Sequence, residues 1–313
     1  NLAFCNDEAH KKSFCPFKPM LSSLLRSLAL LLLTSGFAFA KGPEPGHSSA
    51  NARYMANEGL MVVHGETKVV FDPLFRHAFG QYQLLPKNME DALFAGEPPF
   101  DGINAVFISH YHGDHFSPVD VLRLLIEQPG IQLYAPAQAV TVLRSVAGKQ
   151  DEAVLDRVTA VELAYKDAPV TLEMEGLIIE AVRIPHSGWP EGRADVENIS
   201  WRVTLNETTT VLHMGDADVD DVHFERDANY WDKRHTHMAF PPYWFFSSAQ
   251  GTGILENRIK AGHSVGVHVP VSIPTVPSLR TQELRGVDLF TEPGEARDIP
   301  LAVPVVVEKD TEE

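Results

Sequence analysis

The feature that most constrains this chain is a group of metal-ligand residue types directly after a short apolar segment. Residues 107–118 read F-I-S-H-Y-H-G-D-H-F-S-P, with candidate ligands at His110, His112, Asp114 and His115. In extended backbone, residues i and i+2 point to the same side, so both imidazoles of the H-x-H pair can face one cation. Gly113 lets the backbone turn before the D-H pair. Nitrogen and oxygen donors without sulfur favour zinc, manganese or iron, so the stretch predicts a metal site rather than a solvated turn.

Short apolar segments bounded by turn-forming residues predict a chain rich in strands. The expected strands cover residues 59–63, 67–71, 103–109, 131–134, 157–163, 170–173, 177–184, 199–205, 209–214, 264–269 and 301–307, with a hairpin turn at 64–66. Helices are expected over 137–146 and 251–261, and after Ser117, which can cap a helix that has Pro118 at its first position. Residues 75–100 have no clear period and predict an inserted loop. Without a strict alternation of strands and helices, two sheets with helices outside them are expected.

The composition limits the class of partner. The chain has 313 residues, 44% of them hydrophobic, and a formal net charge of −16. This apolar content is sufficient for a core. A strongly acidic chain is poorly suited to nucleic acid, because phosphate contacts need Lys and Arg. We therefore expect a small-molecule substrate and no nucleic acid; the oligomeric state is left open.

The N-terminal part of the sequence predicts export. Residues 20–40 contain Arg26, a short apolar region and an A-x-A cleavage site, as in a signal peptide, although an uncleaved anchor is the alternative. Residues 1–19 are an upstream segment of unknown role, 41–54 a flexible lead-in, and 55–313 the folded domain. Both cysteines, Cys5 and Cys15, precede the expected cleavage site, so the mature chain would lack thiol ligands and disulfides. We expect a periplasmic or secreted protein with no membrane anchor after cleavage.

The order of further ligand-type residues strengthens the metal prediction. The motif is followed by His186 in R-I-P-H-S-G, Asp216 in L-H-M-G-D-A and His268 in V-G-V-H-V-P, and is preceded by Asp72 in V-V-F-D-P. Together with H-x-H-x-D-H, this set resembles the metallo-β-lactamase superfamily over residues 55–275. The resemblance implies an α+β, four-layer αββα sandwich whose metal ligands lie at strand ends.

Transferred position by position, the resemblance implies two divalent metal ions, with zinc favoured and manganese or iron as alternatives. His110, His112 and His186 would hold the first ion, and Asp114, His115 and His268 the second. Asp216 would bridge the two, and Asp72 would support a ligand from behind. His263 competes with His268 as the last ligand, and His213 is expected to be a core histidine bonded to a neighbour.

The resemblance also narrows the function. True β-lactamases of this superfamily have a cysteine or serine in place of the bridging Asp216, so this chain looks more like the lactonase-like branch of metal-dependent hydrolases. The implied reaction is attack by a metal-activated hydroxide on an ester, lactone or phosphodiester of a small molecule, with Asp114 and Asp216 as catalytic residues. The alternatives are an iron-dependent oxidoreductase of the same fold and a non-catalytic metal-binding protein.

Overall fold

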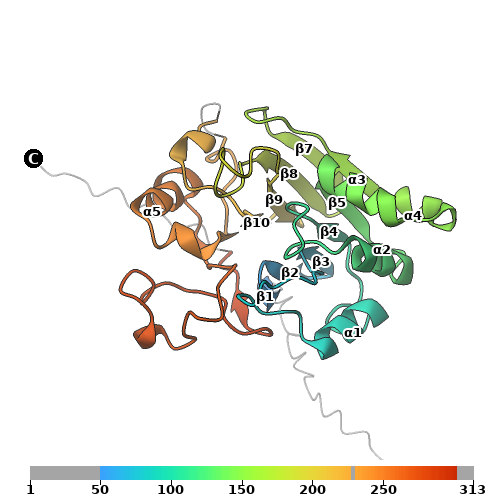
Figure 1. Ribbon diagram of the computed structural model, residues 1–313, viewed down its shortest axis with the longest axis horizontal. Coiled ribbons are helices and arrows are strands. Elements are labelled where there is room, and N and C mark those ends of the chain that lie inside the picture. The colour runs from blue at the N-terminus through green and yellow to red at the C-terminus, as the bar shows by residue number, and fades with distance from the viewer. Residues whose placement is uncertain (1–49, 227–229, 302–313) are drawn as a thin grey trace, which may run out of the picture. The chain divides into compact units, whose positions relative to one another are not determined.

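The computed structural model describes residues 50–226 and 230–301. Within them the chain forms two mixed sheets (Figure 1). The seven-stranded sheet has the order β13 (Ala296–Asp298), β1 (Asn51–Ala56), β2 (Gly59–His64), β3 (Thr67–Phe71), β4 (Ala105–Phe107), β5 (Gln132–Pro136), β6 (Val158–Val161). The six-stranded sheet has the order β12 (His263–Ser264), β11 (Met238–Phe240), β10 (Thr209–His213), β9 (Ile199–Leu205), β8 (Leu177–Arg183), β7 (Val170–Met174).

Helices cover the outer faces of both sheets. The α-helices are α1 (Lys87–Ala95), α2 (Pro118–Glu127), α3 (Ala137–Val146), α4 (Glu152–Leu155) and α5 (Ala249–Ile254). Short helical turns occupy Lys149–Asp151, Asp221–His223, Tyr243–Phe245, Leu255–Ile259 and Pro277–Leu279. In Figure 1, α2, α3 and α4 lie together on one side, and α5 lies on the opposite side.

Three clusters of buried apolar side chains fill the spaces between these layers. The inner faces of the two sheets meet in the central cluster, where the buried Phe107 of β4 packs against Trp201 of β9 with tilted rings 5.2 Å apart between centroids. A second cluster joins the first sheet to α1, α2 and α3, and a third joins the second sheet to α5. Alternation of side chains across each strand lets one sheet contribute to two clusters. The predicted four-layer αββα sandwich is confirmed.

The hairpin between β2 and β3 follows from its turn residues. His64 pairs with Thr67, so Gly65 and Glu66 form a two-residue turn. Gly65 has a φ of 60°, a value that glycine adopts without a Cβ penalty. The expected hairpin is confirmed, and β3, which follows it, ends directly before Asp72.

Helix α2 begins where the sequence predicts, but its cap differs. Pro118 is at the first helical position and Ser117 is at the N-cap in extended conformation. The Ser117 hydroxyl bonds to the carboxylate of Asp120 instead of a backbone N–H group, so the predicted side-chain cap is not formed. Val119 and Ile126 of this helix are exposed, whereas Val121, Leu122, Leu124 and Leu125 are buried.

Several expected boundaries are wrong. Residues 51–54, placed in the flexible lead-in, belong to β1, which pairs with β2 and β13. The expected loop 75–100 contains α1, whose short apolar face buries only Leu93 and Phe94 alongside Glu90. The expected strand 264–269 is limited to β12 and isolated bridges.

Some expectations fall on residues that the structure does not describe. The upstream segment 1–19, the signal segment 20–40, residues 41–49 of the lead-in and residues 302–307 of the expected last strand lie outside the described residues. Within the described ranges, no helix combines the length and apolar character needed to cross a membrane.

Candidate metal centre

The predicted site residues converge at one edge of the sandwich. The motif follows β4, His186 follows β8, Asp216 follows β10, and His268 lies after β12. His186 and Asp216 are close in space because a bridge joins His186 to Ala217. Gly215 permits this approach: its φ is 54°, and a Cβ there would lie 2.6 Å from the Cβ of Ser109. Strand ends from both sheets therefore supply one set of donors.

One half of the site consists of His110, His112 and His186. The Nε2 atom of His110 lies 3.0 Å from Nδ1 of His112. Nε2 of His186 lies 3.1 Å from Oδ2 of Asp216, and Nε2 of His110 lies 3.9 Å from the same oxygen. The four side chains could hold one metal ion.

The remaining ligand-type residues form the other half. Nε2 of His115 and Nε2 of His268 each lie 3.2 Å from Oδ1 of Asp216. Nε2 of His268 also lies 3.4 Å from Oδ2 of Asp114. Asp114, His115 and His268 are all buried and could hold a second ion.

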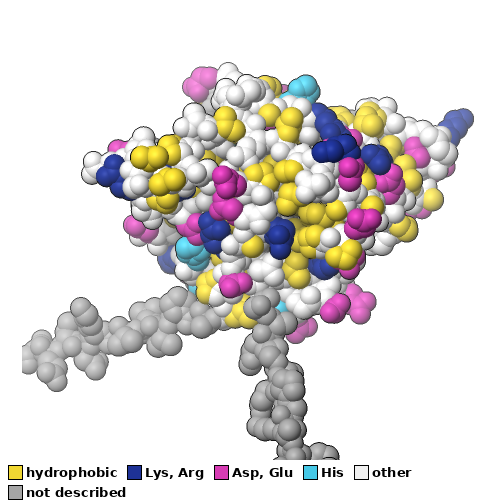
Figure 2. All heavy atoms as spheres, turned by 90° about the horizontal axis from the view of Figure 1, so that it is seen from below, with side chains coloured by type: hydrophobic (Ala, Val, Ile, Leu, Met, Phe, Trp, Pro, Cys, Tyr) yellow, Lys and Arg dark blue, Asp and Glu magenta, His cyan; other side chains and the backbone are white. Residues whose placement is uncertain are grey.

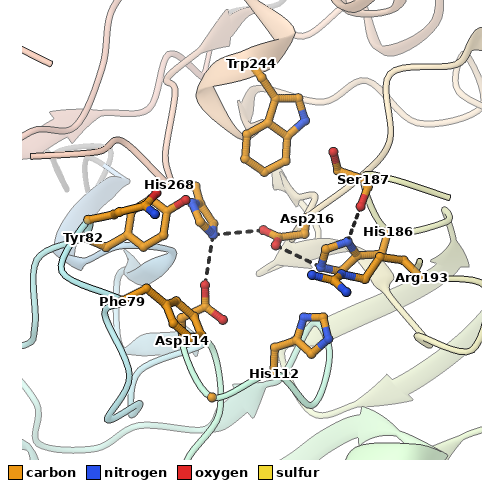
Figure 3. A pocket seen from close by; sticks show the side chains of 12 residues that line it. Phe79, Tyr82, His112, Asp114, His186, Ser187, Arg193, Asp216, Trp244 and His268 are labelled. Carbon is orange, nitrogen blue, oxygen red and sulfur yellow. Dashed lines mark hydrogen bonds and ion pairs between the residues drawn. The ribbon is translucent and has the colours of Figure 1, made fainter. Parts of the chain in front are cut away.

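Asp216 lies between the two halves and presents one oxygen to each. Its Oδ2 faces His186 and His110, and its Oδ1 faces His115 and His268. Figure 3 shows this carboxylate at the centre of the site, with dashed contacts on both sides. The arrangement is the one that a bridging carboxylate requires.

The unsatisfied donors in this centre fit metal ions. Nε2 of His115, His186 and His268 and Oδ1 of Asp216 are buried without a hydrogen-bond partner. Such groups cost about 1–3 kcal/mol each when left unpaired. Imidazole nitrogens and carboxylate oxygens that converge without competing hydrogen bonds are the donor set that zinc, manganese and iron prefer.

The electrostatics of the side chains favour the ligating protonation states of His110, His112 and Asp216. Burial lowers the pKa of His110 far below its ordinary value and that of His112 to about 4, which keeps both rings neutral. Burial opposes the charge of Asp216, but His268 and His115 outweigh it and hold the pKa of Asp216 well below its usual range. The carboxylate is therefore ionised, as a metal ligand must be.

Asp72 supports the site from behind, as predicted. Its Oδ2 accepts a hydrogen bond from Nδ1 of His115 at 2.9 Å, and its Oδ1 accepts one from the backbone N–H of Ser109 at 2.7 Å. This bond leaves Nε2 of His115 directed at Asp216. Carboxylate partners of this kind orient a ligating imidazole.

Asn57, in the turn between β1 and β2, is a site residue that the sequence analysis missed. It is fully buried, and its Nδ2 donates to the backbone oxygen of Asp114 at 2.9 Å. Its own carbonyl accepts from the backbone N–H of His268 at 3.0 Å. One residue thus links two members of the second half, and no motif in the sequence marks it.

Its neighbour Glu58 lies against the buried His213, whose Nε2 bonds to the backbone oxygen of Glu58 at 3.0 Å. Glu58 Oε2 lies 3.0 Å from Nε2 of His213, and neither residue is exposed. Burial opposes the charged imidazole, but the Glu58 carboxylate outweighs it and raises the pKa of His213. His213 is therefore bonded to a neighbour, as expected. Glu58 and His213 also lie near Asp72, in a third group of potential ligands.

A pocket opens over the centre. It has a volume of about 370 Å³ and is lined by Phe79, Gln81, Tyr82, His112, Gly113, Asp114, His186, Ser187, Arg193, Asp216, Trp244 and His268. Aromatic residues form one part of the wall: the Tyr82 ring meets His268 edge-on at 4.2 Å between centroids, and Trp244 lies 5.4 Å from the same ring. Of residues 243–246, which could wall a pocket or fill the core, Trp244 does the former and Phe245 the latter.

The structure separates the two competing histidines. His268 lies in the centre, where it has a φ of 55°. His263 instead contacts Asp288 at 2.9 Å, and its side chain is 42% exposed. His268 is the histidine that the structure brings to Asp114 and Asp216.

Comparison with known families agrees with this geometry. Residues 67–239, more than half of the chain, match the model of the family described as the β-lactamase superfamily domain. The chain belongs to the β-lactamase superfamily. The matched range contains six of the seven predicted ligands and ends before His268. No curated protein is significantly similar in sequence to this superfamily member.

Solved structures share the fold of this superfamily member at low identity. Igni18, a metallo hydrolase from Ignicoccus hospitalis, is 15% identical with a TM-score of 0.51, and covers 80% of this chain and 97% of its own. A possible metal-dependent hydrolase from Veillonella parvula has the same identity and TM-score, with coverages of 80% and 99%. An isothiocyanate hydrolase from Delia radicum gut bacteria is 14% identical with a TM-score of 0.52, covering 79% and 98%. These similarities concern the fold.

Proposed function

We propose that this protein is a metal-dependent hydrolase that uses two divalent ions, with zinc as the favoured metal, to cleave an ester, lactone or phosphodiester of a small molecule. The observation that carries the proposal is the placement of Asp216, whose two oxygens face two separate groups of histidine ligands. The solved metallo hydrolases of the same fold support the general class.

The residues divide into two metal-binding sets. His110, His112 and His186 would hold one ion, and Asp114, His115 and His268 the other, with Asp216 shared. Ions bound in these positions supply Lewis acidity, which polarises a substrate oxygen and lowers the pKa of water.

The carboxylates at the floor of the pocket also suit proton transfer. Asp114 and Asp216 both line the cavity and are only slightly exposed. A carboxylate at this position can accept a proton from water and return it to the leaving oxygen. Asp72 would hold His115 in its ligating orientation throughout.

The pocket favours a small molecule. A volume of about 370 Å³ lies within the range of small-molecule sites. On the face shown in Figure 2, acidic side chains lie beside basic ones instead of leaving a continuous basic surface. With a net charge of −16, nucleic acid is a poor candidate for the substrate.

The test is hydrolysis by the purified chain before and after metal removal. We expect cleavage of model esters, lactones or phosphodiesters that a chelator abolishes and that added Zn²⁺ restores. Hydrolysis that continues unchanged in metal-free protein would contradict the proposal. Metal analysis with an optical spectrum, on the same sample, separates zinc from an iron centre built for oxygen chemistry.

We also propose that residues 20–40 direct export and are removed. The support is the arrangement of Arg26, the apolar region and the A-x-A site. Fractionation of cells that express the chain should recover a shortened protein outside the cytoplasm. Full-length protein confined to the cytoplasm or held in the membrane would contradict this.

A further inference from the structure

Arg193 is a cation in the pocket wall, and no acidic side chain among the described residues forms an ion pair with it. Its guanidinium donates from Nη1 to the backbone oxygen of Gly192 at 3.1 Å. No ion pair to Arg193 occurs within residues 50–226 and 230–301. In a chain with 42 acidic residues and 26 basic ones, an arginine left without a carboxylate beside a cavity is available to a ligand.

The loop that carries Arg193 is bonded at its start to the Asp216 segment. The backbone N–H of Ser187 donates to the backbone oxygen of Asp216 at 2.7 Å, and the backbone N–H of Gly188 donates to Oδ2 of Asp218 at 3.2 Å. The Arg193 side chain passes close to Gly188, where a Cβ would lie 3.8 Å from its Cγ. Arg193 is exposed, and its side chain lies on the His186 side of the pocket, as Figure 3 shows.

The opposite part of the wall is aromatic. Phe79 and Tyr82 lie on the Asp114 and His268 side in Figure 3, and Trp244 lines the pocket at the top of that view. Phe79 is 65% exposed, which is high for a large apolar side chain, although one side of its ring lies near His77 at 6.1 Å between centroids. The pocket thus has a cationic end and an apolar end, with the metal-binding residues between them.

We propose that Arg193 forms an anion subsite, so that the substrate carries a carboxylate or phosphate group on one side of the bond to be cleaved and an apolar group on the other. This proposal rests on the proposed function, because it assigns a substrate class to the same site. A guanidinium binds carboxylate and phosphate through paired hydrogen bonds, and the partial exclusion of water in a pocket strengthens them.

Matched esters test the subsite. The p-nitrophenyl esters of butanoic acid, succinic acid and 3-phosphonopropanoic acid have similar chains that end in a methyl, a carboxylate or a phosphonate. We expect metal-loaded protein to prefer one or both anionic esters in kcat/KM. Arg193→Gln should lower kcat/KM for them by about 10- to 100-fold, mainly through KM, and leave the butanoate ester within about twofold. The anionic ester that loses more identifies the group.

Arg144→Gln is the matched control, because Arg144 lies exposed on α3, away from the pocket-lining residues. Calorimetry with succinanilic acid, an anilide that keeps the carboxylate, measures binding without ester turnover. Arg193→Gln should weaken this binding and Arg144→Gln should not.

The outcomes separate the two proposals. If no ester is cleaved and chelation has no effect, the proposed function fails. If esters are cleaved in a metal-dependent way but Arg193→Gln changes charged and neutral esters equally, or leaves the binding of succinanilic acid unchanged, the anion subsite is wrong and the hydrolase remains.

Discussion

His263 and His268 belong to one short segment, yet their surroundings differ in every respect that matters for metal binding. His263 lies at the edge strand β12, half-exposed, with Nε2 bonded to Asp288. His268 is buried in the centre, and both of its ring nitrogens lack a hydrogen-bond partner. A cation would stabilise an exposed histidine that already has a hydrogen-bond partner only slightly. It would stabilise a buried histidine whose ring nitrogens have no hydrogen bond much more. In this pair of histidines, buried ring nitrogens without a hydrogen-bond partner, more than residue type, distinguish the predicted ligand from its neighbour.

Two asparagines in turns between strands also differ in burial and in their distance from the candidate site. Asn57 and Asn206 both have left-handed backbone, with φ values of 50° and 48°. Each donates its Nδ2 to a backbone oxygen, that of Asp114 at 2.9 Å and that of His64 at 2.8 Å. Asn57 is buried at the metal centre and Asn206 is exposed at the β9–β10 turn. Asn57 contacts two predicted ligands, whereas Asn206 bonds to the β2–β3 hairpin.

The largest expected effect is that of removing His268. His268→Ala should lower the bound metal from two ions to one per chain and reduce hydrolysis by more than about 100-fold, the upper end of what loss of an outer-shell partner costs. His263→Ala should leave both quantities unchanged, since its side chain faces Asp288. Metal analysis and kcat/KM on both variants check this. Equal losses in the two variants would remove the distinction.

An intermediate effect is expected at Asn57. Asn57→Gly keeps the left-handed turn but removes the amide that holds Asp114, so the affinity of the second metal position should fall by about 10- to 100-fold. Asn206→Gly makes the same change at a turn without ligands and should leave the affinity as it was. Titration of metal-free protein with Zn²⁺ gives both affinities. A loss of affinity in neither variant, or in both, would contradict a positioning role for Asn57.

The smallest effect concerns the His263 region and its pH dependence. Burial opposes the charge of Asp288, but bonds from His263 and Arg297 outweigh it and lower the pKa of Asp288 from 3.8 to about 2. A lowered folded-state pKa stabilises the fold above the unfolded value, and this stabilisation is lost as the pH falls toward about 2. Because Asp288 is partly exposed, Asp288→Asn should reduce the free energy of unfolding by only about 1 kcal/mol at pH 7.

Urea denaturation of both proteins over a pH series checks this. The difference between the wild type and Asp288→Asn should shrink below pH 3.8 and nearly vanish near pH 2. The metal content at pH 7 should be unaffected. A difference that grows on acidification would show that the sign is wrong.

The parts of the fold that were predictable depend on local signals. The hairpin at Gly65, the start of α2 at Pro118 and strand β9 follow from turn residues, a helix-start pattern and apolar runs. Helix α1 was missed because its buried face contains little beyond Leu93 and Phe94, too few positions to give a visible period. Strand β1 was missed because its first residues follow a Pro- and Gly-rich segment.

In the candidate site, too, the residues marked by local sequence patterns were predictable and those placed by long-range contacts were not. The motif at His110 to His115 is local, and His186 and Asp216 follow strands, so order along the chain was enough to propose them. His268 was expected at the end of a strand but lies in irregular backbone with left-handed φ, held by the carbonyl of Asn57. Asn57 and Arg193 contribute through contacts between segments far apart in the chain or through position in the pocket, which no local spacing reveals.

The central claim is that Asp216 joins two metal positions, and metal stoichiometry tests it most directly. Metal-free protein titrated with Zn²⁺ should take up two ions per chain, and hydrolysis should rise to its full value as the second position fills. Asp216→Asn should weaken both positions, because each oxygen of Asp216 faces one set of histidines. Uptake of a single ion, or full binding of two ions by Asp216→Asn, would contradict the account.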